Sequence, residues 1–457
     1  MIASIKKILG IPELKKKIVF TLMMLCVCRL GAFIPVPGIN GDEAAKVLSF
    51  AAGGGQNLFQ YLSIFTGGAF SHMTIIALGV MPYITSSIIM QLLTALVPSL
   101  QRDMRENPEQ GKKKVGKYTR LFTVALSLFQ SMLFAKYALS LNVGHPGVIA
   151  PQVLQATIFG VPWLFFVLTM ITMTAGTVFL MWIGEQITER GVGNGVSLII
   201  TLGILSSLPS VIGSMIKSLN LDSQEPGQLT FSSMAVLLAI FVLIIIGTIL
   251  IIQGQRKIPL QHARRVVGRH ETQGGNSYIP LKLNYAGVIP VIFASALLMF
   301  PATLAQFLGR GTFFGSIAAS LTPGSVVYTV TYVVLILFLT YFWTATQFHP
   351  EQIASDMKKN GAFIPGVRQG RPTQEFLESS MNKITLAGAI FLALIAILPT
   401  LVGRLLGVDQ TISHFFGGTS LLILVGVVLD TTKQIESHLL MKRYDGFMKK
   451  GRIRGRT

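Results

Sequence analysis

The sequence predicts an all-α polytopic membrane protein in which ten transmembrane helices form two inverted, pseudo-symmetric halves of five. Three observations lead to this class. Hydrophobic residues make up 51% of the 457 residues, charged residues make up only 12%, and the apolar residues gather in runs long enough to cross a bilayer. Because soluble domains carry about 25% charged residues, the composition excludes a soluble enzyme, a disordered chain and a single-span receptor.

The apolar runs define the expected spans. A helix needs about 20 apolar residues to cross a bilayer core of about 30 Å, and lipid cannot satisfy the open backbone groups of other structures. We expect spans at 18–34, 73–97, 118–139, 158–183, 193–216, 231–252, 285–308, 326–347, 384–402 and 415–432. Spans one to five form an N-terminal half (18–217) and spans six to ten a C-terminal half (218–432).

Lys and Arg residues set the orientation. With both termini in the cytoplasm, 32 of the 38 Lys and Arg residues lie in inner segments and five lie in outer segments, while Arg29 lies within the first span. Cytoplasmic loops of membrane proteins carry such an excess. Residues 1–17 are therefore expected to be a cytoplasmic amphipathic segment, 253–284 and 348–383 long cytoplasmic loops, and 433–457 a basic cytoplasmic tail.

The predicted spans contain almost no charge. The exceptions are Arg29, near the outer end of the first span, and Asp430, near the inner end of the tenth. We expect Arg29 to snorkel, to pair with a neighbour or to line a cavity, and Asp430 to lie at the interface. Because ionisable residues within a membrane are usually functional, their scarcity disfavours an ion-coupled transporter and a hydrophilic selectivity filter. It favours an uncharged path for a cargo of variable chemistry.

A short sequence repeat links the second and seventh spans. Residues 79–84 and 287–292 share a glycine, a valine, a proline and an isoleucine at a constant offset of 208 positions. Four matches in six apolar positions also arise by chance. A true repeat across an odd number of spans would be inverted, with a site at the interface of the halves near the midplane. The proline in each segment is expected to loosen its helix.

Several loops have distinctive sequences. The outer loop 35–71 carries glycines at 53–55 and 67–68, and the short segment between them is expected to be re-entrant or to form a helix on the outer surface. The glycines of 184–195 predict a tight turn between two membrane helices, since no strand precedes them as a nucleotide-binding loop requires. The basic cytoplasmic loops are suited to acidic partners, ribosomal RNA or anionic lipids.

Two other classes of membrane protein remain as alternatives. A secondary transporter of small solutes would need polar binding groups near the midplane, and a membrane-embedded acyltransferase or protease would need a catalytic cluster. The sequence shows neither, and it shows no phosphate loop and no Cys/His metal spacing. Cys26 and Cys28 lie about 200° apart on a helix, too splayed to form a disulfide. We therefore expect a protein that is not an enzyme and that holds no cofactor.

Six stretches resemble the signature segments of one family. They are 35–38, 79–91, 184–195, 286–301, 361–368 and 417–421. With them the chain resembles, over essentially its whole length, the bacterial SecY family, whose members form the central subunit of a protein-conducting channel. The resemblance implies an hourglass pore between the two halves, through which unfolded secretory polypeptides cross the membrane. It also implies a lateral gate that releases transmembrane segments into lipid.

The resemblance also implies roles for individual residues. It places an aliphatic pore ring at Val80, Ile84, Val196, Ile200, Ile292 and Ile423. It places a plug at about 57–70 and a lateral gate between spans two and three on one side and spans seven and eight on the other, with the gate lined by Thr85, Gln91, Ser295 and Phe300. Partners would dock on the cytoplasmic loops, through Arg264, Arg265 and Arg368.

The partners and location follow from the same resemblance. The implied partners are the subunits SecE and SecG, the motor ATPase SecA, the ribosome, signal sequences and nascent polypeptides, and anionic lipids. The implied location is the bacterial cytoplasmic (inner) membrane. Energy for transport would come from a partner or from the membrane potential, because the chain shows no nucleotide site of its own.

Overall fold

A helix lies in each of the ten segments predicted to span the membrane. The computed structural model describes residues 11–52, 63, 65–155, 157, 162–217, 231–262, 265–267, 270–272, 276–308, 320, 325–405 and 419–450. The ten helices are α2 (Pro12–Gly31), α5 (Met81–Leu96), α7 (Pro108–Gly144), α9 (Trp163–Arg190), α10 (Gly195–Lys217), α11 (Phe231–Gln253), α12 (Ile289–Leu308), α14 (Val326–Gln347), α16 (Arg371–Leu405) and α18 (Thr419–Lys450). Shorter helices lie between them: α3 (Gly41–Ala52), α6 (Pro98–Glu106), α8 (Pro151–Leu154) and α15 (Pro350–Lys359).

Not every one of these helices is long and apolar enough to cross a bilayer by itself. Within the described residues six are: Pro108–Gly144, Trp163–Arg190, Gly195–Ile216, Met234–Gln253, Val326–Lys359 and Arg371–Gly403. α5 and α6 form a seventh span if taken together, although they meet at a bend of 94°. α2 is continuous from Pro12, so the expected break between residues 17 and 18 is absent, and the lysines at 15–17 belong to the first helix.

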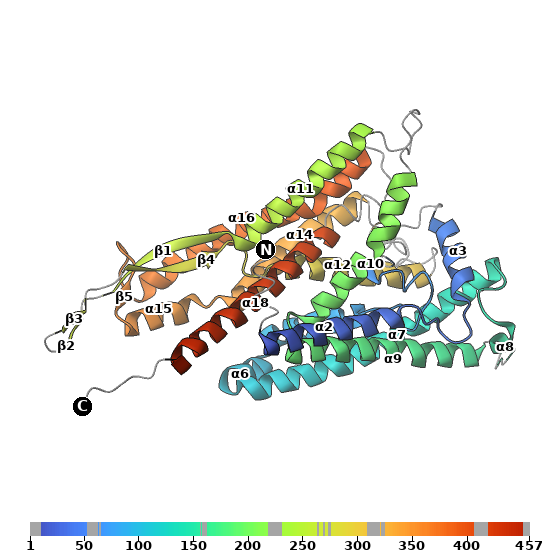
Figure 1. The fold of residues 1–457 in the computed structure, drawn as a ribbon, viewed down its shortest axis with the longest axis horizontal. Coiled ribbons are helices and arrows are strands. Elements are labelled where there is room, and N and C mark those ends of the chain that lie inside the picture. Colours follow the sequence, from blue (N-terminus) through green and yellow to red (C-terminus); the bar gives the residue numbers. More distant parts are fainter. Residues whose placement is uncertain are drawn as a thin grey trace.

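Contacts between helices divide them into two groups. In the first group, α9 contacts α2, α7 and α10, and α7 contacts α5. In the second group, α16 contacts α11 and α14, while α12 contacts α14 and α18. The first group runs from blue to green in Figure 1 and the second from green to red. The groups meet where α10 contacts α18, and again where α12 contacts α5 and α7.

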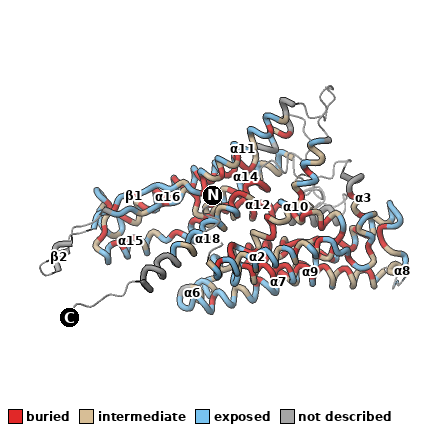
Figure 2. The backbone as a smooth tube through the Cα atoms, viewed as in Figure 1, coloured by how far each residue is buried: buried red, intermediate tan, exposed pale blue. Residues whose placement is uncertain are grey.

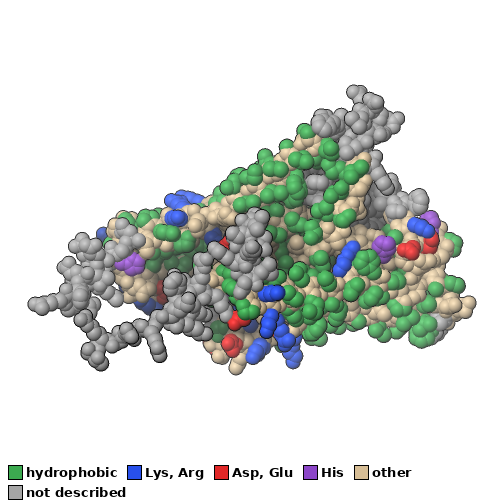
Figure 3. Space-filling model, viewed as in Figure 1, with side chains coloured by type: hydrophobic (Ala, Val, Ile, Leu, Met, Phe, Trp, Pro, Cys, Tyr) green, Lys and Arg blue, Asp and Glu red, His purple; other side chains and the backbone are tan. Residues whose placement is uncertain are grey.

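The outside of the helix groups is apolar. Large exposed side chains include Phe129 and Met132 on α7, Ile171 on α9, and Leu238 and Leu243 on α11. Figure 3 shows such side chains as a broad hydrophobic surface over the helices, and Figure 2 shows the buried residues along the helix sides that face one another. An apolar surface of this extent is suited to lipid rather than to water.

The second and seventh helices begin differently from what the sequence predicts. Residues 73–80, expected as the first turns of the second span, form turns outside α5. Pro82 and Pro290 are each the second residue of their helix. Since a proline in the first turn removes a donor that would have no partner in the helix, it favours the start of a helix. The expectation that these prolines loosen their helices is therefore wrong.

The two loops predicted to be long and cytoplasmic, 253–284 and 348–383, fold together. β1 (Gln255–His262) pairs antiparallel with β4 (Asn276–Lys282) on one side and with β5 (Ala362–Phe363) on the other, with Ile258 opposite Ile279 and Gln261 opposite Phe363. A second hairpin joins β2 (Arg265–Val267) to β3 (His270–Thr272) and lies beyond this sheet in Figure 1. The sequence predicts loops here and gives no indication of these strands.

This sheet has an apolar core of its own. Ile258 and Leu260 of β1 and Leu281 of β4 are buried together with Met357 of α15 and Leu377 of α16. The two predicted loops thus form one small folded unit, joined to the membrane helices through the long α16.

Candidate pore and gate

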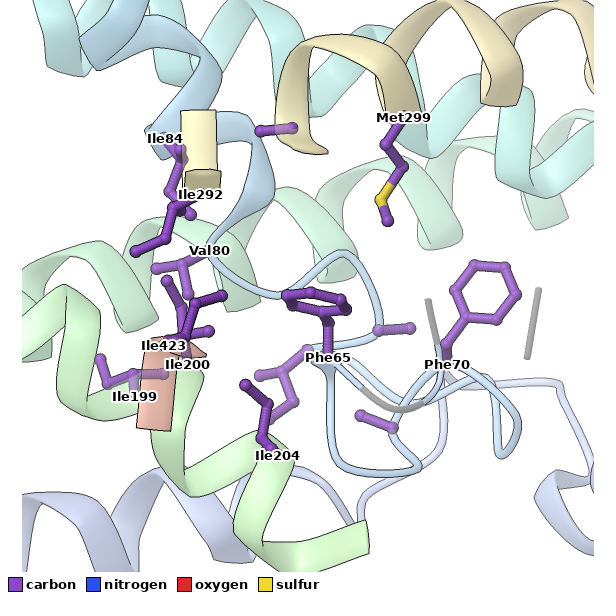
Figure 4. Packing of buried hydrophobic residues seen from close by; sticks show 14 of the residues in the cluster. Phe65, Phe70, Val80, Ile84, Ile199, Ile200, Ile204, Ile292, Met299 and Ile423 are labelled. Atoms are coloured by element: carbon purple, nitrogen blue, oxygen red, sulfur yellow. The ribbon is translucent and has the colours of Figure 1, made fainter. Parts of the chain in front are cut away.

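The predicted ring residues converge where the two helix groups meet. Five of them are buried in a single apolar cluster: Val80, Ile84, Ile200, Ile292 and Ile423. They come from the start of α5 and from α10, α12 and α18, and Figure 4 shows their side chains close together. The sixth residue, Val196 of α10, is partly buried and packs against the same cluster beside Gly184 of α9.

The chemistry of this cluster is uniformly aliphatic. Valine and isoleucine side chains neither donate nor accept hydrogen bonds, and they have no charge that would attract an ion or trap a charged cargo. A narrow apolar constriction can exclude water and so hold back ions. A ring of this kind can close a path without binding any particular side chain that passes through it.

A cavity lies next to the ring. Its empty volume is about 550 Å³, and its lining includes the ring residues Val80, Ile84 and Ile200. Among the described residues that line it, Arg29 is the only charged one, and the rest are mostly apolar. Of the three expectations for Arg29, the structure supports two: Arg29 lines the cavity, and it pairs with a neighbour by donating to the Gly67 carbonyl.

The predicted plug is described only in part. Of about 57–70, the structure describes Ser63 and residues 65–70, and the remainder lies outside the described residues. The described part is a turn whose Phe65 and Phe70 are buried. Phe70 meets Phe134 of α7 edge to face, with ring centroids 5.4 Å apart. The described part of the predicted plug is therefore packed against the helices, beside the cavity and the ring.

The polar residues predicted at the gate lie on two helices that touch. Thr85 of α5 donates to the Met81 carbonyl at 3.0 Å, and Ser295 of α12 donates to the Ile292 carbonyl at 2.8 Å. Gln91 donates from Nε2 to the Ser87 hydroxyl at 3.2 Å, while its buried Oε1 has no hydrogen-bond partner among the described residues. The side chain of Phe300 lies outside the described residues. Because α12 contacts α5 and α7, the two predicted walls of the gate lie against each other.

The predicted docking arginines belong to the loops 253–284 and 348–383. Arg368 is exposed in the turn between β5 and α16, and its carbonyl accepts a hydrogen bond of 2.7 Å from the Thr373 hydroxyl. Arg265 begins β2, where its backbone pairs with Thr272, but its side chain lies outside the described residues. Arg264 also lies outside them. Arg368 is thus the one predicted docking side chain that the structure places.

Sequence reasoning missed a polar cavity beside α15. Its empty volume is about 1620 Å³, and it is lined by the end of α14, the start of α15, α16 and Met104 of α6. Glu351 and Glu378 are among the lining residues. The residues come from both helix groups, so no local pattern could have revealed the cavity. Among the described residues, no group of three or more His, Cys, Asp and Glu side chains is placed to hold a metal ion.

Sequence reasoning predicted the glycine-rich turn between α9 and α10 but missed what it binds. α9 ends at Arg190 and α10 begins at Gly195, so the prediction of a tight turn is confirmed. The Gly193 N–H donates to the side-chain oxygen of Gln434 on α18 at 2.9 Å, and the Val192 N–H donates to the Thr21 hydroxyl on α2 at 3.1 Å. The turn therefore ties the two helix groups together through the bond from Gly193 to Gln434.

Sequence comparisons identify the family of this arrangement. The SecY family model matches residues 74–432. The protein translocase subunit SecY of Chlamydia trachomatis serovar D is 59% identical over 455 residues, which cover 99% of this chain and 100% of that protein. The protein of the same name from Thermus thermophilus is 40% identical over 461 residues and covers 100% of both chains.

Solved structures have the same fold. The structure of a protein-conducting channel matches with a TM-score of 0.59 at 19% identity, covering 92% of this chain and 91% of that one. Sec61 in the canine ribosome–channel complex matches with a TM-score of 0.58, also at 19% identity and with the same coverage. The chain belongs to the SecY family of protein translocase subunits, and it has the fold of the protein-conducting channels.

Proposed function

We propose that this chain forms the channel through which unfolded secretory polypeptides cross the bacterial cytoplasmic membrane, and from which transmembrane segments pass sideways into lipid. The observation that carries the proposal is the convergence of Val80, Ile84, Ile200, Ile292 and Ile423 from both helix groups into one uncharged constriction. A path for polypeptides must accept every type of side chain and bind none of them tightly, and an aliphatic ring meets both conditions.

Closure would depend on the ring together with the plug. An apolar constriction resists wetting, and the turn at 65–70 lies beside the same cavity as the ring. A related structure is described as showing that the plug domain of SecY stabilises the closed state and maintains a membrane seal. By the same logic, residues 57–70 of this chain would seal the resting channel and move aside for a cargo.

Lateral release would use the boundary between the halves 18–217 and 218–432. α12 contacts α5 and α7 along this boundary, and Thr85, Gln91, Ser295 and Phe300 lie on these helices. Parting α12 from α5 would expose the path to lipid. An apolar cargo segment would then partition into the bilayer according to its transfer free energy.

The cytoplasmic unit would receive the driving partner. Arg368 is exposed on it, and the basic hairpin of β2 and β3 extends from it. Sec61 and Ssh1, which share this fold, are found in complexes with ribosomes. SecA would bind the same side during export, SecE and SecG would complete the complex, and anionic lipids would meet the flanking basic residues. Both termini would lie in the cytoplasm.

A reversible lock on the gate tests this proposal. The chain, with Cys26 and Cys28 replaced by alanine, is reconstituted with SecE and SecG in proteoliposomes, and SecA-driven import of a preprotein is scored by protease protection. Oxidation of a Thr85→Cys, Phe300→Cys pair should abolish import, and reduction should restore it. Each single-cysteine chain serves as a control. Normal import through a fully cross-linked pair would contradict the proposed gate.

A further inference from the structure

The single arginine of the first span binds the backbone of the turn at 65–70. Nη1 of Arg29 donates to the Gly67 carbonyl at 2.7 Å, across 38 positions of sequence. The guanidinium also lies over the Phe33 ring, 4.9 Å from its centroid. Arg29 is partly buried and lines the cavity beside the ring. Because this cavity is lined mostly by apolar residues, a hydrogen bond from a charged donor is stronger there than in water.

The other side of this turn rests directly on the backbone of α10. A Cβ on Gly67 would overlap the Ser206 hydroxyl and would lie 3.1 Å from the Gly203 Cα. A Cβ on Gly203 would in turn overlap the Phe65 carbonyl. Gly67 also has a φ of +64°, which L side chains rarely adopt. Only glycine at both positions permits this close approach, so α10 provides a seat that is shaped for the turn.

The turn is itself closed by internal hydrogen bonds. The Gly68 N–H donates to the Ser63 carbonyl at 2.8 Å, and the Phe70 N–H donates to the Thr66 hydroxyl at 3.2 Å. The Ser63 and Ser71 hydroxyls are also hydrogen-bonded to each other. A turn braced in this way moves as a unit. Holding Gly67 therefore also fixes the position at which the preceding residues join the turn.

We propose that Arg29 and Gly203 form a latch that holds the 65–70 turn, the described end of the predicted plug, in the sealing position. This inference rests on the proposed function, and it assigns Arg29 as a positioning residue that acts through the turn and does not need to contact the cargo. Losing the guanidinium would leave the Gly67 carbonyl without its charged donor. Adding a methyl group at position 203 would push the Phe65 carbonyl off α10. Either change would favour the unsealed state.

Native Cys28 reports on the latch. It is buried on α2 and lines the same cavity, so a charged thiol reagent added from the outer side should reach it only when the turn leaves its seat. In a Cys26→Ala background, Gly203→Ala should raise the labelling rate of Cys28 about tenfold, the effect of losing roughly 1.4 kcal/mol of closure. This variant leaves the neighbours of Cys28 on α2 unchanged, so a faster rate reports that the cavity beside Cys28 has become accessible.

Matched variants separate the latch from a general loss of structure. Arg29→Ala should raise resting ion conductance in planar bilayers in step with Gly203→Ala, whereas Arg29→Lys, which keeps a charged donor, should restore most of the seal. Gly213→Ala is the control on the same helix, because no described atom lies within 4 Å of the added Cβ. The resting conductance of the double variant should exceed that of either single variant only slightly, since both substitutions release the same turn.

The outcomes distinguish the latch from the channel itself. If Ile84→Asn raises conductance while Arg29→Ala and Gly203→Ala leave both conductance and Cys28 labelling at the level of the unmodified chain, the latch is refuted and the proposed channel stands. If Ile84→Asn also has no effect, the proposed function fails with it. Should Arg29→Ala not assemble with its partner subunits, the Cys28 labelling rate and the conductance of Gly203→Ala, compared with Gly213→Ala, decide the question.

Discussion

α5 and α12 begin with the same backbone conformation, but the segments that precede them have different neighbours. Gly79 and Gly287 both have a φ of +60°, and each lies two residues before its helix. Each helix then places an isoleucine, Ile84 or Ile292, in the ring. The repeated residues are thus also a repeat of backbone conformation, which chance similarity of apolar sequence would not produce.

What precedes the two helices differs. A Cβ on Gly79 would lie 3.2 Å from the Thr66 side chain of the latched turn, whereas none of the described atoms lies within 4 Å of the equivalent point on Gly287. Before α12, Asn284 donates from Nδ2 to the Gly287 carbonyl at 2.6 Å and accepts from the Ala286 N–H at 3.0 Å, directly after β4. The start of α5 thus lies against the 65–70 turn, whereas the start of α12 is fixed by Asn284, just after β4 of the sheet.

The largest effect should come from the docking side. Arg368→Glu should abolish SecA-driven import, because it reverses an exposed charge on the surface where the motor would bind, and it should leave resting conductance unchanged. Protease protection of the preprotein and bilayer conductance measure the two effects. Arg371→Glu, at a side chain that is 87% exposed three residues further on, is the control and should retain import. Normal import in the Arg368 variant would remove the docking role.

Polar substitution of either ring isoleucine should have a similar effect, because Ile84 and Ile292 occupy equivalent positions in α5 and α12. Ile84→Asn and Ile292→Asn should each raise resting ion conductance on the order of tenfold, equivalent to about 1.4 kcal/mol removed from the barrier. Each should also relax selection against defective signal sequences. Ile84→Leu and Ile292→Leu keep the ring apolar and should leave both properties unchanged. A leak from only one of the two asparagine variants would show that the starts of α5 and α12 are not equivalent.

A smaller effect is expected where α12 joins β4. Asn284→Ala removes two hydrogen bonds at a buried site and should lower the free energy of unfolding by about 1–3 kcal/mol, measured by thermal denaturation in detergent. Asn194→Ala removes a single exposed hydrogen bond, which the Asn194 side chain accepts from the Ser197 N–H at 3.3 Å. This variant should lower the free energy of unfolding by less. Equal losses in the two variants would show that Asn284 does not fix the start of α12.

Hydropathy located the helices but not all of their ends. Residues 73–80 are as apolar as a membrane helix, yet they form packed turns, and a run of buried apolar residues does not distinguish these two outcomes. The prediction that Pro82 loosens its helix was wrong, because α5 begins only one residue before it and a proline in the first turn does not disturb a helix. The alternation of buried Ile258 and Leu260 in β1 is too short to stand out within a basic loop.

The site was predictable where it depends on residue type and not where it depends on distant contacts. The resemblance named ring residues that the structure brings together from α5, α10, α12 and α18. The bond between Arg29 and Gly67 joins a helix to a turn 38 positions away, and Gly193 binds Gln434 across 241 positions. Such pairs are set by packing of the whole bundle, so the sequence indicated only that Arg29 was unusual.

The central claim is that a polypeptide passes between Ile84 and Ile292. The most direct measurement is photocross-linking of an arrested secretory chain, with the photoreactive group placed in turn at position 84, at position 292 and at the exposed, lipid-facing position 171 of α9. The account predicts strong cross-links from both ring positions and none from position 171. Cross-links from neither ring position, in a complex that still holds the arrested chain, would contradict it.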